Sequence, residues 1–76
     1  MTPNRLVECL ATLRWTSLDL ADALECDISL VEAWLEGMEE IPVKAAAWME
    51  TLATVHAAAE REKPASLKGR RFKGVQ

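Results

Sequence analysis

Residues 15–37 decide the fold, and they read WTSLDLADALECDISLVEAWLEG. Thr16 and Asp19 stand three residues apart, which is the spacing of a capping box, where a hydroxyl and a carboxylate satisfy the first N–H groups of a helix. We therefore expect a short helix to begin directly after Thr16. Its apolar residues recur on one side and predict its buried contacts: Leu20, Ala21 and Leu24.

A second short helix is expected directly after the first. The apolar pattern is interrupted at Glu25-Cys26-Asp27, and Asp27 can cap a helix over residues 28–36. Within that helix Val31 and Trp34 share one side, and Gly37 suits the left-handed conformation that ends a helix. Two short helices joined by a three-residue turn predict a helix-turn-helix motif.

Two more helices flank this motif. Thr2 and Pro3 predict the start of the first, because the missing N–H of proline costs nothing at the first helical position. The other opens at Pro42, and we expect it to reach about Glu62 before Pro64. The first helix carries a predicted buried row of Leu6, Cys9, Leu10 and Leu13. The last helix carries a predicted buried stripe of Ala45, Trp48, Leu52, Val55 and Ala59. Core anchors are expected at Trp15, Trp34 and Trp48.

The chain of 76 residues is long enough for one domain and no second core. No segment alternates apolar and polar residues, so the predicted fold class is all-α, a small helix-turn-helix bundle of four to five helices. We expect the domain to occupy residues 1–62. The remaining residues, 63–76, carry two glycines and five basic residues, and we expect them to form a flexible, disordered basic tail.

Charge is distributed unevenly along the chain. The whole sequence has 12 acidic and 9 basic residues, for a net charge of -3. Residues 1–60 hold eleven acids and three bases, whereas residues 61–76 hold one acid and six bases. An acidic body with a basic tail is the first indication of how the protein meets its partners.

Several matching residues make the stretch from Leu13 to Ala53 resemble the Cro/C1-type helix-turn-helix family. They are Trp15-Thr16, Leu20-Ala21, Leu24, Cys26, Val31, Trp34, Gly37, Ile41-Pro42 and Leu52-Ala53. The resemblance implies that the second helix of the motif lies in the DNA major groove. It places the base-reading positions at Ile28, Ser29, Glu32, Ala33 and Glu36, and the phosphate-contacting position at Ser17, followed by Leu18.

The residue types at these positions depart from the family pattern. Bases are read mostly by Arg, Lys, Asn and Gln, and residues 15–43 contain none of the four and no His. The same stretch contains eight acids: Asp19, Asp22, Glu25, Asp27, Glu32, Glu36, Glu39 and Glu40. Phosphate binding needs several Lys or Arg contacts, so this composition argues against groove reading.

Apolar residues among these acids predict a protein-binding face instead. The predicted contact residues are Leu18, Asp27, Ile28, Leu30, Glu32, Leu35, Glu36, Glu39 and Glu40. Single surface leucines are also ordinary, so the prediction rests on the group. In size and inverted charge the chain is similar to the QseM-like antiactivators, which restrain activators of conjugative transfer in mobile genetic elements. That resemblance implies an antiactivator in transcription regulation, whose partner is a transcriptional activator with a basic surface.

The alternative function is a sequence-specific DNA-binding regulator of the Cro/C1 type. Its candidate nucleic-acid contacts are Ser29, Lys68, Arg70, Arg71, Phe72 and Lys73. Basic arms can enter a minor groove, and an aromatic ring can stack on an exposed base. A tail of this composition also fits a simple solubilising role.

Other function classes lack residues to support them. His56 is the sole histidine, and Cys9 and Cys26 have no metal-ligand spacing. No nucleophile can be paired with a base, and no glycine-rich phosphate loop is present. We therefore expect no enzyme activity, cofactor, metal or small-molecule ligand. The sequence has neither a membrane-spanning run nor a secretory signal, so we expect no membrane partner and a cytoplasmic location.

Overall fold

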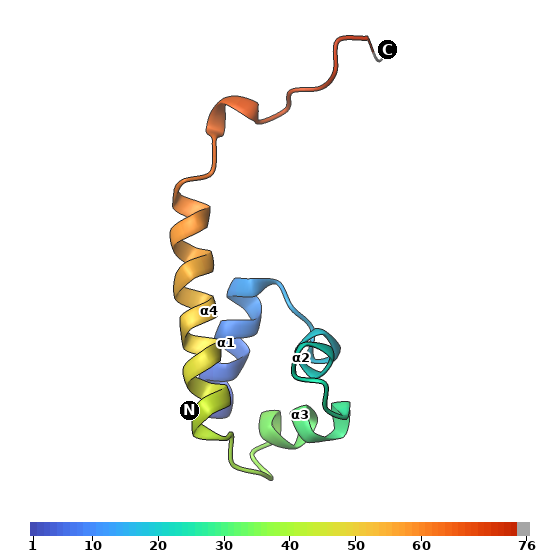
Figure 1. Ribbon diagram of the computed structural model, residues 1–76, viewed down its shortest axis with the longest axis vertical. Coiled ribbons are helices and arrows are strands. Elements are labelled where there is room, and N and C mark those ends of the chain that lie inside the picture. Colours follow the sequence, from blue (N-terminus) through green and yellow to red (C-terminus); the bar gives the residue numbers. More distant parts are fainter. Residues whose placement is uncertain (75–76) are drawn as a thin grey trace.

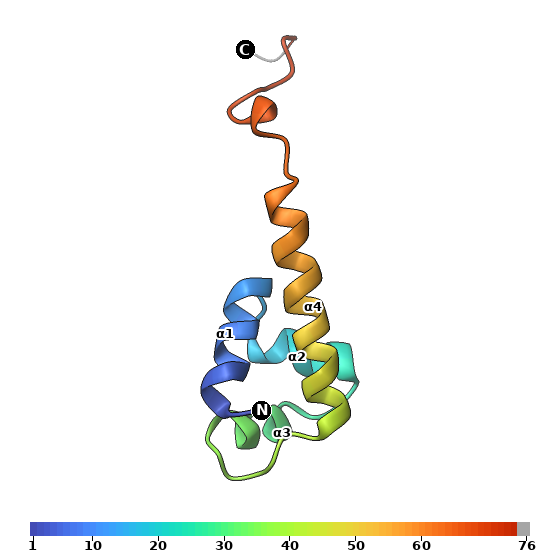
Figure 2. The same ribbon diagram turned by 90° about the vertical axis from the view of Figure 1, so that its left-hand side faces the viewer.

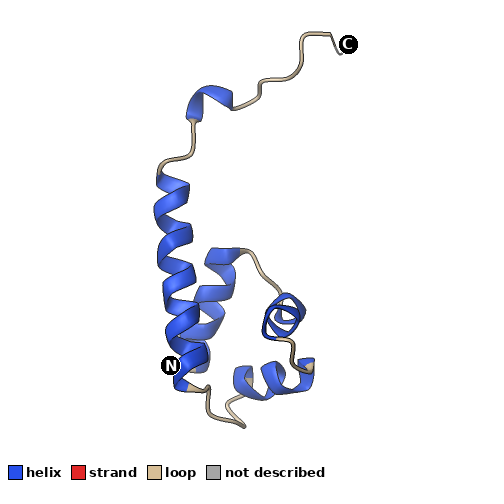
Figure 3. Ribbon diagram, viewed as in Figure 1, coloured by secondary structure: helices blue, strands red, loops and turns tan. Residues whose placement is uncertain are grey.

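The computed structural model describes residues 1–74, which are helical throughout their ordered core. The four α-helices are α1 (Pro3–Leu13), α2 (Ser17–Leu24), α3 (Ile28–Leu35) and α4 (Val43–Arg61) (Figure 1). A short 3-10 helix, η1, follows at Ala65–Leu67. No strand occurs in this part of the chain (Figure 3), so the all-α prediction is confirmed.

Side-chain caps fix the starts of the short helices as the sequence predicts. The backbone N–H of Arg5 donates to the Thr2 hydroxyl at 3.1 Å, and Pro3 occupies the first turn of α1. At α2 both bonds of the capping box form: Asp19 N donates to Thr16 Oγ1 at 3.1 Å, and Thr16 N donates to Asp19 Oδ2 at 2.8 Å. Each bond satisfies a backbone N–H that the helix itself leaves without an acceptor.

The ends of the short helices rely on left-handed residues. Gly37 follows α3 at φ +74°, as predicted, although α3 itself ends at Leu35, one residue earlier than expected. The ends of α1 and α2 place Arg14 and Glu25 in the same conformation, at φ 59° and 54°. A residue other than glycine costs roughly 1–2 kcal/mol in the left-handed conformation. Because Arg14 and Glu25 stand there in place of glycine, the sequence does not mark these two positions as helix ends.

One core joins the four helices. α1 packs against α4 and α3, and α2 packs against α3. The buried residues are Leu6, Cys9, Leu10, Leu13, Leu20, Ala21, Val31, Trp34, Ile41, Met49 and Ala53. The predicted row of α1 is confirmed in full, including Cys9, whose burial raises the pKa of its thiol.

The prediction of which side of α4 is buried is wrong. The helix buries Met49 and Ala53, whereas Trp48, Val55 and Ala59 of the predicted stripe are exposed. Ala45 and Leu52 are only partly buried against the core. The reason is the position of α1, which approaches α4 from the Met49 side. In addition, the second half of α4 extends past the other helices (Figure 2).

Trp48 is therefore not a core anchor. Its side chain is 36% exposed, and its ring lies 6.1 Å from that of Trp15, centroid to centroid, with the planes tilted by 54°. Trp15 itself is partly buried and packs on the core. Of the three tryptophans only Trp34 is fully inside.

The chain after α4 leads away from the helices. Residues 62–74 are all exposed, and Figures 1 and 2 show them extending beyond the end of α4. The final two residues of the predicted tail, 75–76, lie outside the described residues. Within residues 1–74, no helix combines the length and the apolar character that a bilayer crossing requires.

Candidate partner-binding surface

The structure places all eight acids of residues 15–43 in solvent. We call them the acidic surface: Asp19, Asp22, Glu25, Asp27, Glu32, Glu36, Glu39 and Glu40, all of them exposed. They belong to α2, to the turn between α2 and α3, to α3 and to the loop before α4. Since α2 and α3 pack against each other, the acids gather around one helix pair.

Two members of the acidic surface also hold the fold together. Asp19 belongs to the capping box of α2, and Asp27 caps α3 by accepting the backbone N–H of Ser29 at 2.9 Å. Hydrogen bonds from Ser29 hold the pKa of the Asp27 carboxyl below its ordinary value, because they favour the charged form. Asp27 therefore stays ionised at neutral pH.

The basic residues of the chain do not neutralise this surface. Among residues 1–74, every ion pair lies on α1 or α4 or at the end of α4. The shortest joins α1 to α4: Arg5 donates from Nε to Glu50 Oε2 at 2.9 Å and from Nη2 to Glu50 Oε1 at 2.6 Å. The charge of the acidic surface is thus left to attract a basic partner and to repel phosphates.

The four predicted apolar contacts differ in how much surface they offer. Leu18 is 54% exposed and lies on the first turn of α2. By contrast, the other three pack partly against the core: Ile28, Leu30 and Leu35. Leu18 is therefore the apolar residue of α2 that is most available to a partner.

Sequence reasoning missed Met38. Its side chain is 77% exposed in the loop after α3, between Gly37 and Glu39. A flexible thioether that is followed in the chain by Glu39 and Glu40 suits adaptable protein contacts. The available signal was its place in the loop, where no helical periodicity applies and a large apolar residue has no core to enter.

The positions that would read DNA offer few donors. Ser29 is exposed, but its backbone N–H is already bonded to Asp27. Glu32 and Glu36 are exposed acids, and Ala33 is partly buried. The tail candidates Lys68, Arg70, Arg71, Phe72 and Lys73 are all exposed. Figure 1 shows the tail at the opposite end of the molecule from α3, so the structure does not bring Ser29 and these residues together.

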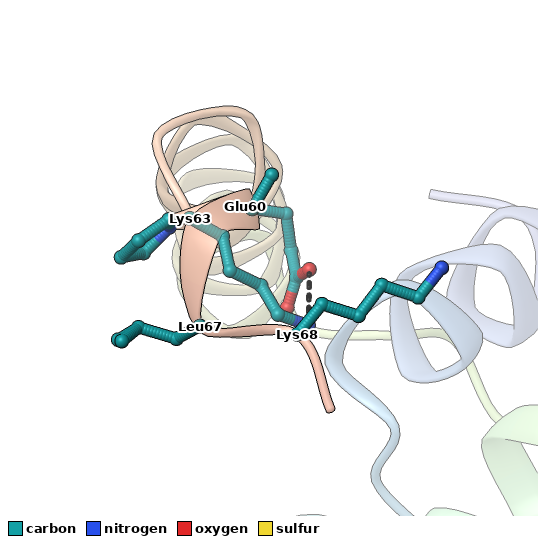
Figure 4. A pocket seen from close by; sticks show the side chains of 6 residues that line it. Glu60, Lys63, Leu67 and Lys68 are labelled. Carbon is teal, nitrogen blue, oxygen red and sulfur yellow. Dashed lines mark ion pairs between the residues drawn. The ribbon is translucent and has the colours of Figure 1, made fainter. Parts of the chain in front are cut away.

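A hollow lies between the last turn of α4 and η1 (Figure 4). Its lining is Glu60, Lys63, Pro64, Ala65, Leu67 and Lys68. Lys63 Nζ stands 3.8 Å from Glu60 Oε2, so part of its charge is compensated within the hollow. One turn earlier, His56 Nε2 lies 3.6 Å from Glu60 Oε1. Within residues 1–74, no three His, Cys, Asp or Glu side chains are grouped closely enough to hold a metal ion.

Comparisons of the chain with protein-family models, with curated proteins and with solved structures gave no match.

Proposed function

We propose that the α2–α3 pair is a helix-turn-helix that binds a protein instead of DNA, and that the chain is an antiactivator. In this proposal the acidic surface and its exposed apolar residues occupy a basic surface on a transcriptional activator. Occupation of that surface blocks the contact of the activator with DNA or with polymerase.

The supporting observation is the unbalanced charge of residues 15–43. Eight exposed acids and no basic residue surround the helix that would have to enter a major groove. Specific DNA binding depends on electrostatic attraction between several Lys or Arg side chains and the DNA phosphates. Here the exposed acids make that electrostatic contribution to the binding free energy repulsive. The same charge speeds the encounter with a basic protein surface.

Apolar contacts supply most of the affinity in this proposal. Leu18 and Met38 are exposed large side chains beside the acidic surface, and they lose water when a partner covers them. Ile28 and Leu30 add only the part of their surface that the core leaves open. A substitution at either of these two would disturb packing as well as binding, so Leu18 and Met38 are the better positions to test.

The first experiment is a backbone amide NMR titration of the full chain with a mixed-sequence DNA duplex at low salt. Shifts confined to residues 64–74, or no shifts, are expected. Shifts of Ser29, Glu32 and Ala33 amides would mean that α3 enters a groove, and the antiactivator proposal would then be wrong.

The second experiment measures inhibition directly. A regulator captured by the immobilised chain is tested for DNA binding with and without the chain, and the chain is expected to abolish it. Leu18→Asp should remove this inhibition while the helical circular-dichroism spectrum is unchanged. The matched control is Val7→Asp, at a valine of α1 that is 53% exposed and lies outside the acidic surface. Equal loss in both variants would contradict the assignment of Leu18.

The second candidate is DNA binding through the tail, which the exposed cluster of Lys68, Arg70, Arg71 and Lys73 favours. Such binding must weaken steeply as salt increases. Deletion of residues 64–76 should abolish it and leave the melting temperature of the helices unchanged, because residues 64–74 are all exposed and none belongs to the core. DNA binding that survives the deletion would exclude this second candidate.

A further inference from the structure

The helix α4 carries an apolar stripe that its own chain covers only in part. Ala45, Trp48, Leu52, Val55 and Ala59 follow one another at intervals of three and four residues, the heptad spacing of helices that pack side by side. This spacing predicts burial. Yet Trp48 is 36% exposed, Val55 is 61% exposed and Ala59 is exposed.

The open side of α4 is distinct from the side that faces α1. At 3.6 residues per turn, Trp48, Val55 and Ala59 lie within roughly 40° of one another around the helix axis. Their common direction is roughly 120° away from that of the buried pair Met49 and Ala53. The tail does not return to cover this side, since residues 62–74 extend away from the end of α4 (Figure 2).

We propose that a second copy of this chain covers the stripe, with the two α4 helices packed antiparallel. Opposite charges at the two ends of the stripe favour this occupant. Lys44 belongs to the first turn of α4, and Glu62 is the residue that caps its C-terminus. Five helical turns separate the two, which places both at the same margin of the stripe. Both are exposed, and within residues 1–74 neither forms an ion pair.

An antiparallel pair places Lys44 of each copy level with Glu62 of the other, which gives two opposite-charge contacts. A parallel pair would instead align lysine with lysine and glutamate with glutamate. The same antiparallel register sets the large ring of Trp48 level with the small residues Ala58 and Ala59 of the second copy. A large side chain opposite small ones lets two helices approach closely.

The dimer surface and the acidic surface are separate. The stripe belongs to α4, whereas the acidic surface belongs to α2, α3 and their connections. Failure of self-association would therefore leave the antiactivator proposal standing, and failure of the antiactivator proposal would leave the dimer standing.

Sedimentation equilibrium of the full chain tests the proposal. Over chain concentrations from about 10 μM to about 1 mM, the mass is expected to rise from one chain of 8.4 kDa toward two. A mass of one chain over the whole range would overturn the proposal. Val55→Asp should raise the dissociation constant of the dimer at least about tenfold, because it buries a charge in the stripe. The matched control Val43→Asp changes a valine on another side of α4, 82% exposed against 61% for Val55, and should leave the constant unchanged.

Charge reversal tests the antiparallel direction. Lys44→Glu and Glu62→Lys should each weaken self-association roughly three- to tenfold, since each puts like charges together at both ends. The double variant should restore it. Single reversals without effect would mean that the helices are parallel, and a double variant as weak as the singles would mean that the two residues do not meet. Circular dichroism of each variant shows that it is folded.

Discussion

Leu18 and Leu20 of α2 provide a matched test of which residues build the fold and which face a partner. They are two positions apart on the same short helix, yet Leu18 is 54% exposed and Leu20 is 0% exposed. Leu20→Ala removes side-chain atoms from the middle of the core, whereas Leu18→Ala removes them from solvent. The two variants should therefore differ in stability although the chemical change is identical.

The magnitude follows from the burial. A fully buried leucine cut back to alanine loses about 3 kcal/mol, from lost transfer energy and the cavity left behind. A domain of this size has a total unfolding free energy of roughly 4–11 kcal/mol. Leu20→Ala should therefore lower the melting temperature by about 12–24 °C. Leu18→Ala should stay within about 0.5 kcal/mol of the parent chain, because it leaves the core untouched.

Thermal unfolding followed by circular dichroism measures both variants, and urea unfolding gives the free energies. Binding to the regulator should distinguish the two variants in the opposite order. At a temperature where both are folded, Leu18→Ala should bind the regulator more weakly than Leu20→Ala does. Equal losses of stability in the two variants, or a loss below about 1 kcal/mol for Leu20→Ala, would contradict this prediction.

Three further predictions concern local features of the fold. Thr16→Ala removes the hydroxyl that accepts the Asp19 N–H and should lower the unfolding free energy by about 1 kcal/mol, measured in urea. Gly37→Ala should cost about 1–2 kcal/mol, because φ is +74° there; a change below 0.5 kcal/mol would contradict this. The pKa of Glu50 is held below its ordinary value by the hydrogen bonds from Arg5, so this carboxylate stabilises the fold above a pH of about 4.3. Glu50→Gln should therefore melt below the parent chain at pH 7, and the difference should shrink as the pH falls through the folded-state pKa; a gap that stays constant down to pH 2 would refute it.

The sequence by itself determined the local structure. Thr2, Thr16 and Asp27 specify where three helices begin, because a capping side chain acts on a backbone N–H only two or three residues away. Gly37 specifies the end of α3 for a similarly local reason. The charge pattern that supports the candidate surface is also a property of the sequence, since acids without neighbouring bases remain in solvent in almost any fold.

Only the tertiary structure decided how much of each apolar residue remains exposed. Ile28, Leu30 and Leu35 fit an open patch by their positions, but the packing of α3 on the core covers part of each. Met38 lies in the loop after α3 and is 77% exposed, which no helical periodicity could indicate.

The clearest case is α4. Its stripe of Trp48, Val55 and Ala59 has the spacing of a buried surface, and the spacing is identical whether the covering helix belongs to the same chain or to another. The direction from which α1 approaches selects Met49 and Ala53 instead. Hydrophobic periodicity depends on one helix alone, whereas burial depends on where every other helix lies, and that is a long-range property which only the assembled core determines.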